Sequence, residues 1–275
     1  MTDLSTIGVV PAREPRRVWT LRGLQRGVTR VRLSLAAGLR ADEPLTVALG
    51  VTVALSLYFL VVPGVDLAIS ALFFSADGFA LAQNPVLRAL RKSSSWVLGL
   101  MLLGLIGEVA VGLWRGRGRL RGHARRAAVL LAGLALGSGV VVNGLLKGLW
   151  GRARPIQIDT FGGDAAFTPA WTISDNCASN CSFVSGEASS AAWMVAVVVL
   201  MVPAEHRRWA LPAVLAYAGA LSLNRLAFGG HFLSDILLSW ALTALVLTVL
   251  YRLTLSCPRQ ARRLRRARRQ VAIAG

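Results

Sequence analysis

Charged residues are scarce in this 275-residue sequence, and cysteines are scarcer still. Only 16% of the residues are charged, against about 25% in soluble globular domains, and 55% are hydrophobic. This composition argues against a soluble domain and favours an integral membrane protein. The three cysteines, Cys177, Cys181 and Cys257, are too few for a disulfide framework. None lies in a C-x-x-C zinc or redox pattern.

Acidic residues are few, and the resulting charge excess is unevenly placed along the chain. There are 13 acidic residues against 31 lysines and arginines, which gives a formal net charge of +18. Such a charge is compatible with nucleic-acid binding, but Lys and Arg also collect in the cytoplasmic segments of membrane proteins. With the N-terminus inside, 24 of the 31 cations fall on the cytoplasmic side, in 1–44, 115–126, 207–208 and 252–275. The charge therefore indicates topology, with both termini cytosolic, and no nucleic-acid partner is expected.

Long apolar runs dominate the middle of the chain. Crossing a hydrocarbon core takes about 20 residues of helix, and six runs reach or approach that length: 45–62, 96–114, 127–146, 186–203, 209–228 and 232–250. The fourth is the weakest because it opens with small and polar residues. The last two are so close in sequence that we expect them to form a tight helical hairpin. The prediction is an all-α membrane bundle of six transmembrane helices over 45–251, between a basic cytosolic arm (1–44) and tail (252–275).

Four features of the connections leave alternatives open. The arm is either a partly helical segment against anionic headgroups or a disordered extension. Segment 66–95 suits an interfacial helix on the outer leaflet or a packed loop. The long outer loop 148–182 is expected to be a functional lid or disordered. Within it, Cys177 and Cys181 would form a disulfide in an oxidising compartment or remain free buried thiols, whereas Cys257, on the inside, is expected to stay reduced.

Three polar clusters lie at the predicted outer ends of different helices. They are Lys147-Gly-Leu-Trp-Gly-Arg-Ala-Arg154-Pro155, Ser182-Phe-Val-Ser185-Gly186-Glu187, and the stretch from Asn224-Arg225 to His231 and Asp235. A cation near a helix end usually only snorkels towards the headgroups. Three clusters on one face, in a chain whose other cations lie mainly inside, indicate a site.

The residue types in these clusters suit a phosphate. Lys147, Arg154 and Arg225 can balance and orient a phosphoryl group. Ser185 and the backbone N–H groups around Gly186, at a helix N-terminus, favour an anion.

Three further side chains carry the chemistry. His231 supplies a nitrogen nucleophile, and Asp235, one helical turn later, would fix its tautomer and stabilise the imidazolium. Glu187 could protonate a leaving alkoxide.

The order and spacing of the clusters resemble the type-2 phosphatidic acid phosphatase superfamily, whose signature is K-x6-R-P, then P-S-G-H, then S-R-x5-H-x3-D. The resemblance implies hydrolysis of a membrane lipid phosphate or diphosphate without metal or cofactor. It also implies a phosphohistidine on His231, aided by Asp235. The phosphoryl oxygens would be held by a set of six residues: Lys147, Arg154, Ser185, Gly186, Asn224 and Arg225.

Two residues depart from this signature. Asn224 stands where the family has serine, and it can still donate a hydrogen bond to phosphate. Glu187 stands where the family has its general-acid histidine. A carboxylic acid can take that role only if its environment raises its pKa, for example through burial or an apolar wall such as Phe183.

Three functions fit the sequence. The first is a phosphatase of the bacterial inner membrane, acting at the periplasmic leaflet on lipid A phosphate, undecaprenyl diphosphate, phosphatidylglycerophosphate or phosphatidate. The second is a phosphotransferase that passes the phosphoryl group from His231 to another lipid. The third is a family member that binds lipid phosphate without turnover, for which Glu187 is the main argument.

Overall fold

The computed structural model describes residues 43–256, and every regular element in this range is a helix. The longer elements are α2 (Glu43–Val61), α3 (Gly64–Ala71), α4 (Pro85–Arg115), α5 (Gly122–Gly133), η2 (Leu134–Leu146), α7 (Gly186–Met201), α8 (Ala204–Ala227) and α9 (Leu233–Tyr251). The short ones are η1 (Ala80–Gln83), α6 (Lys147–Leu149), η3 (Pro155–Gln157), η4 (Asp159–Phe161) and η5 (Arg252–Ser256). The predicted all-α fold is confirmed. The basic arm before Glu43 and the tail after Ser256, with Cys257, lie outside the described residues.

Five helices in the described range are long and apolar enough to cross a membrane. They are Pro44–Val61, Pro85–Arg115, Gly122–Leu149, Ala204–Ala227 and Leu233–Leu255. The third is continuous because the π-helical stretch η2 joins α5 to α6. The sixth predicted span corresponds to α7, which has 16 residues. At about 1.5 Å per residue, a helix of that length falls short of the roughly 30 Å of a hydrocarbon core.

The helices differ in how much of their surface the protein itself covers. In the apolar windows of α2 and α4, only 11% and 6% of residues are buried, whereas in the windows of α8 and α9 the share is 44%. Leu103 and Trp114 of α4 are among the large apolar side chains left exposed. Exposed apolar surface on such helices fits contact with lipid tails.

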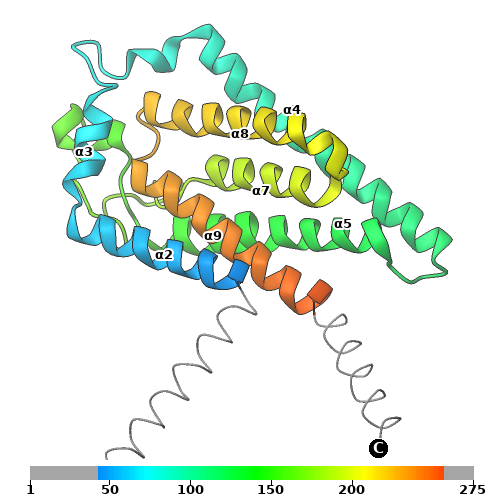
Figure 1. Ribbon diagram of the computed structural model, residues 1–275. Coiled ribbons are helices and arrows are strands. Elements are labelled where there is room, and N and C mark those ends of the chain that lie inside the picture. Colours follow the sequence, from blue (N-terminus) through cyan, green and yellow to red (C-terminus); the bar gives the residue numbers. More distant parts are fainter. Residues whose placement is uncertain (1–42, 257–275) are drawn as a thin grey trace, which may run out of the picture. The chain divides into compact units, whose positions relative to one another are not determined.

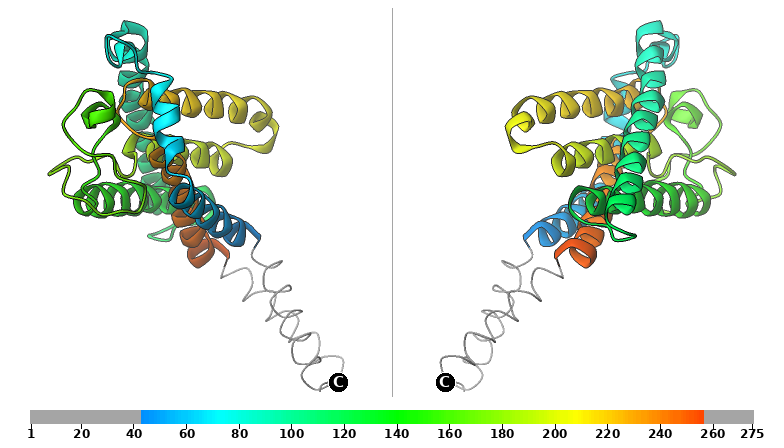
Figure 2. Two further views of the ribbon diagram at one scale, coloured as in Figure 1. Left: turned by 90° about the vertical axis from the view of Figure 1, so that its left-hand side faces the viewer. Right: turned by 90° about the vertical axis from the view of Figure 1, so that its right-hand side faces the viewer.

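The short helix α7 lies at the centre of the bundle. It packs against both α8 and α9, and Figures 1 and 2 show α7 and α8 as an antiparallel pair. Its Ser189 exchanges hydrogen bonds with Ser138 of η2 at 2.6 Å and Thr243 of α9 at 2.8 Å. The expected tight hairpin of the last two helices is therefore wrong, because α7 lies between α8 and α9. A hydrogen bond from Trp240 Nε1 to Ser222 Oγ, at 3.0 Å, still links those two helices.

Helix α4 begins eleven residues earlier than the predicted run 96–114. Asn84 caps it by accepting hydrogen bonds from the N–H groups of Val86 and Leu87, and Pro85 occupies the first turn, where its missing N–H costs nothing. Arg88, Arg91 and Lys92 interrupt the apolar run, but the helix continues through them. Segment 66–95 is therefore neither a single interfacial helix nor a loop, since it contains most of α3, η1 and the start of α4.

One end of the bundle gathers the ends of five elements. The C-terminal ends of α6 and α8 meet the N-terminal ends of α4, α7 and α9 there, at the left in Figure 1. The long loop between α6 and α7 packs beside α3 through an aromatic cluster that includes Phe74, Phe79 and Phe161. The three predicted polar clusters all lie at this end.

Candidate active site

His231 is held in one orientation by a backbone carbonyl. The residue lies in the turn between α8 and α9 with 2% of its side chain exposed, and its Nδ1 is 2.8 Å from the carbonyl oxygen of Ser182. A carbonyl only accepts, so Nδ1 carries the proton and Nε2 keeps its lone pair. Burial lowers the pKa of His231 from 6.5 to about 4. The imidazole is therefore neutral at physiological pH and can act as a nucleophile through Nε2.

Asp235 lies close to His231 without bonding to it directly. Its Oδ2 is 3.7 Å from His231 Nδ1, which is longer than a hydrogen bond but well within electrostatic range. Oδ2 instead accepts from Ser182 Oγ at 2.5 Å and from the N–H of Phe232 at 2.9 Å. Ser182 thus contacts both members of the pair, with its carbonyl on His231 and its hydroxyl on Asp235. The sequence did not single out this role.

Arg152 is the main residue that the sequence analysis missed. It is fully buried, and it donates to Asp235 Oδ1 at 2.7 Å and to Asp66 Oδ2 at 2.8 Å. Its Nε donates to the carbonyl of Thr168 at 2.8 Å, and its guanidinium lies 4.3 Å from the centre of the Phe232 ring. A buried charge is tolerated only when it is paired in this way. Arg152 stood in the first cluster, but its partner Asp66 is 86 residues away in sequence.

Asp66 anchors the start of α9 from the side of α3. Its Oδ1 accepts from the N–H of Ser234 at 2.8 Å, and its Oδ2 accepts from Ser234 Oγ at 2.5 Å. Burial raises the pKa of Asp66, and the guanidinium of Arg152 opposes that rise. The chain Asp66–Arg152–Asp235 therefore fixes the helix that follows His231.

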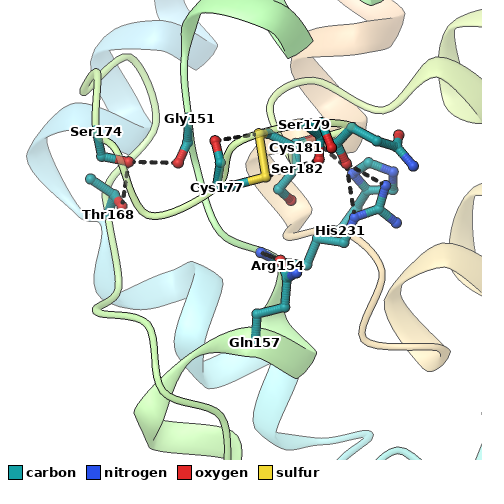
Figure 3. The surroundings of a disulfide bond; sticks show 11 residues. Gly151, Arg154, Gln157, Thr168, Ser174, Cys177, Ser179, Cys181, Ser182 and His231 are labelled. Atoms are coloured by element: carbon teal, nitrogen blue, oxygen red, sulfur yellow. Dashed lines mark hydrogen bonds between the residues drawn. A yellow bond between two sulfur atoms is a disulfide. The ribbon is translucent and has the colours of Figure 1, made fainter.

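Arg154 is bound to the segment that carries the disulfide. Its Nε and Nη2 lie 3.3 and 2.8 Å from the carbonyl oxygen of Asn180. Cys177 and Cys181 form a disulfide, and Figure 3 shows it next to Ser182, which in turn meets His231. Partial burial lowers the pKa of Arg154. Of the two alternatives for these cysteines, the structure has the bonded one, and it shapes the loop that borders the site.

Lys147 approaches the N-terminus of α7. A Cβ added to Gly186 would lie 3.4 Å from Lys147 Nζ and 2.8 Å from Asn143 Oδ1, so the absence of a side chain at Gly186 permits this approach. Ser185 caps α7 by accepting from the N–H of Ala188 at 3.3 Å. A cation therefore lies close to the N-terminus of α7, the end of a helix that favours an anion. Asn143, on the π-helical stretch, is a second neighbour that the sequence analysis did not identify.

Arg225 and Glu187 face one another across the site. Arg225 Nε is 3.6 Å from Glu187 Oε2, and Arg91 Nη2 is 2.9 Å from Glu187 Oε1. Only 3% of the Arg225 side chain is exposed, and its Nε has no hydrogen-bond partner in the described part of the protein. A buried donor without a partner requires an explanation. An anion bound in front of Arg225 would supply that partner.

The glycine pair after α8 makes room for this arginine. Gly229 has φ +60°, a conformation that residues with a side chain rarely adopt, and Phe79 lies against it. A Cβ on Gly230 would lie 2.5 Å from Arg225 Nη2. Each glycine thus has its own function, one in the turn and one beneath the guanidinium. Asn224 donates from Nδ2 to the carbonyl of Leu87 at 2.7 Å, which ties α8 to α4, so its contact with phosphate stays a prediction.

A cavity of about 650 Å³ opens beside these residues. Its lining includes five cations, one carboxylate and the residue before His231: Arg88, Arg91, Lys92, Arg154, Arg225, Glu187 and Gly230. Within residues 43–256, no group of three His, Cys, Asp or Glu side chains could hold a metal ion. The cavity is strongly cationic and is suited to an anion.

Comparisons with known proteins agree on one family. A family model described as the PAP2 superfamily matches residues 128–258. A protein named lipid A 4'-phosphatase from Rhizobium leguminosarum is 36% identical over 218 residues, covering 73% of this chain and 92% of its own length. One of the same name from Francisella tularensis subsp. novicida is 32% identical over 190 residues, covering 66% of this chain and 82% of its own.

A third relative of that name, from Rhizobium etli, is 43% identical over 132 residues. That match spans 48% of this chain and about half, 51%, of the relative. No solved structure gives a significant match.

Proposed function

The chain belongs to the PAP2 superfamily and is a membrane lipid phosphatase, and from this premise we propose that it hydrolyses a lipid phosphate monoester through a phosphohistidine on His231. One observation carries the proposal: Nδ1 of His231 donates to the Ser182 carbonyl, which leaves the Nε2 lone pair free. The same site contains the buried Nε of Arg225, which lies 3.6 Å from Glu187 Oε2 and has no hydrogen-bond partner among the described residues. A nucleophile and a buried cation that can donate to a phosphoryl oxygen are what phosphoryl transfer needs.

In the first step Nε2 of His231 attacks phosphorus, and the bond from phosphorus to the lipid oxygen breaks. Lys147, Arg154 and Arg225, with the N–H groups at Gly186, balance the charge on the three phosphoryl oxygens. The imidazole gains a positive charge, which the Asp235 carboxylate 3.7 Å from Nδ1 stabilises. Arg152 and Asp66 do not touch the phosphate in this mechanism; they position Asp235.

Glu187 is the acid that protonates the departing lipid oxygen. The incoming phosphoryl group takes the place of the Glu187 carboxylate at Arg225, and a proton shared between the two anions relieves their repulsion. In the second step the Glu187 carboxylate removes a proton from water, and the water oxygen attacks phosphorus. The bond between phosphorus and nitrogen breaks, its electron pair returns to Nε2, and inorganic phosphate leaves.

The substrate we propose is the 4'-phosphate of a lipid A-type glycolipid. The support is the shared name of the three relatives, two of which match over 82% and 92% of their length. Undecaprenyl diphosphate, phosphatidylglycerophosphate and phosphatidate are the competing substrates of the same reaction class.

The site faces the periplasm of the inner membrane in this proposal. The loop at the opposite end of α4 and α5, between Arg115 and Gly122, contains three arginines, as expected of a cytoplasmic loop. The disulfide near the site supports an oxidising compartment on the active-site side. Both observations favour the same orientation.

The test is phosphate release from purified protein in detergent, with each of the four lipid classes, in the presence and absence of EDTA. We expect release to be fastest with the lipid A-type 4'-phosphate, unchanged by EDTA, and abolished by His231→Asn. His123→Asn, in an exposed position at the start of α5, is the matched control and should leave the rate unchanged. Release that requires a divalent metal would contradict the mechanism, and a preference for another lipid would contradict only the substrate.

A further inference from the structure

Four polar residues near the start of α4 share one face of the helix. Arg88, Arg91, Lys92 and Ser95 are spaced i, i+3, i+4 and i+7, which places them in a line along one side. All four line the cavity beside His231. Three of them are cations, and the sequence analysis assigned them no function.

This arrangement is unfavourable for the helix itself. Like charges at spacings of three or four residues on one helix face repel one another and destabilise the helix. The N-terminal end of a helix is also its positive end, so the dipole disfavours cations nearby. Helix α4 has no acidic residue in its first turn to offset them. A bound anion would reduce both the repulsion among these cations and their unfavourable interaction with the helix dipole.

The three cations are engaged to different degrees. Arg91 pairs with Glu187, and Arg88 donates to the carbonyl of Ala82 at 2.8 Å and to Gln83 Oε1 at 2.5 Å. Lys92 is exposed and has no hydrogen bond or ion pair with any residue of the described part of the chain. Lys92 is therefore the cation most available to a ligand.

The cavity joins this helix face to the proposed phosphate site. Arg154, Arg225 and Glu187 line the same cavity as Arg88 and Lys92. A volume of about 650 Å³ is far larger than one phosphoryl group needs. Two of the residues proposed to hold the reacting phosphate, Arg154 and Arg225, line this cavity together with the α4 face.

We propose that the α4 face is a second anion subsite, which binds another phosphate or carboxylate on the headgroup of the same substrate. The proposal rests on the proposed function for the position of the reacting phosphate. Arg91 lies between the two subsites, because it lines the cavity on α4 and contacts Glu187 at the catalytic side. The enzyme therefore favours polyanionic glycolipid headgroups over lipids with a single phosphate.

The test measures ligand binding rather than turnover, so it remains decisive if the protein proves inactive. The probes are α,ω-alkane bisphosphonates with spacers of increasing length, each compared with the alkyl monophosphonate of the same length. Binding is measured by titration calorimetry in a neutral detergent. Joining two contacts in one ligand raises affinity when the spacer matches the distance between the sites. We expect at least a tenfold advantage for the bisphosphonate at one optimal spacer length.

Lys92→Ala and Arg88→Ala should each remove most of this advantage, and Arg119→Ala, which deletes an exposed charge in the α4–α5 loop, should keep it. No advantage at any spacer length, or an advantage that survives both substitutions, would overturn the proposal. A final titration adds phosphatidylglycerol to the micelles. If Lys92→Ala changes only the response to that lipid, the face binds membrane headgroups and the proposal is wrong.

Discussion

Arg152 Nη1 lies 2.7 Å from Asp235 Oδ1, and both side chains are completely buried. Arg152 also contacts Asp66, so a single guanidinium joins α3, the long loop and α9 behind the histidine. Asp235 is thereby fixed by two residues that do not line the cavity. Its position beside His231 therefore depends on residues far away in the sequence.

Replacing Arg152 should damage both stability and catalysis. Breaking a buried ion pair from one side typically costs about 3–5 kcal/mol, because it leaves a charge without a partner. We expect Arg152→Ala to lower the unfolding temperature strongly and to abolish activity. A lysine keeps the positive charge but has no planar guanidinium with which to bridge two carboxylates. Arg152→Lys should therefore retain more stability than Arg152→Ala but little activity.

The milder change Asp66→Asn tests positioning separately from folding. It keeps a side chain that can accept from Ser234, and it leaves Arg152 paired with Asp235. We expect kcat to fall several-fold with KM nearly unchanged, and thermal unfolding in detergent serves as the stability control. An unchanged kcat in a fully folded Asp66→Asn variant would contradict a positioning role.

Glu187→Gln should slow the reaction to a degree that depends on the leaving group. General acids contribute about 10²–10⁴-fold to such rates, and an alkyl phosphate needs the proton far more than a nitrophenyl phosphate does. We expect a loss in that range with the lipid and only a small loss with the aryl ester, and Glu187→His should restore part of the lipid activity. Equal losses on both substrates would mean that Glu187 only holds Arg91 and Arg225.

Reduction of the disulfide should weaken substrate binding. The segment after Cys177 provides the carbonyl of Asn180 to Arg154 and that of Ser182 to His231. Freed from the crosslink, this segment gains motion, and both contacts loosen. We expect dithiothreitol to raise KM several-fold and Cys177→Ser to do the same, with no further effect of the reductant on that variant. A reductant effect that persists in Cys177→Ser would assign the change to another group.

The pH profile should report a histidine that is difficult to protonate. Burial lowers the pKa of His231 from 6.5 to about 4, so the nucleophile stays neutral through that interval. We expect kcat/KM to stay level down to about pH 5, once the substrate's own ionisation near pH 6 has been taken into account. A fall in kcat/KM on the acid side with an apparent pKa of 6.5 would contradict a buried, neutral His231.

The same shift in the pKa of His231 should make the stability of the protein depend on pH. The unfolded chain takes up a proton on His231 below 6.5 and the folded chain does not, so stability is lost as the pH falls from 6.5 towards 4. His231→Asn should flatten that part of the stability curve. The comparison uses thermal unfolding of the two proteins across the same buffers.

Motif spacing led to side chains that lie together at one end of the bundle, but not to the residues packed behind them. His231, Arg225, Glu187 and Ser185 were identified because polar residues at the ends of apolar runs stand out from composition alone. Asp66 was not, because it forms its contacts with residues that are distant along the chain. Hydropathy also misplaced the start of α4, since Arg88, Arg91 and Lys92 lower the apolar average over a segment that Asn84 and Pro85 start as a helix.

The last two helices show a second limit of sequence reasoning. A short connection predicts that the two helices it joins pack against each other, but α7 lies between α8 and α9. Small residues of α7 such as Ala188 and Ala191, both fully buried, allow that close approach. Composition alone did not reveal that the shortest apolar run forms the centre of the bundle.

In the proposed mechanism the phosphoryl group passes through His231. The most direct measurement is a brief reaction with lipid carrying a radiolabelled phosphate, stopped in alkaline detergent, followed by peptide mapping. We expect label on the peptide that contains His231, stable in alkali and released by acid, absent from His231→Asn and retained by His123→Asn. Rapid turnover without any labelled protein, or label with the acid-stable, alkali-labile behaviour of an acyl phosphate, would contradict it.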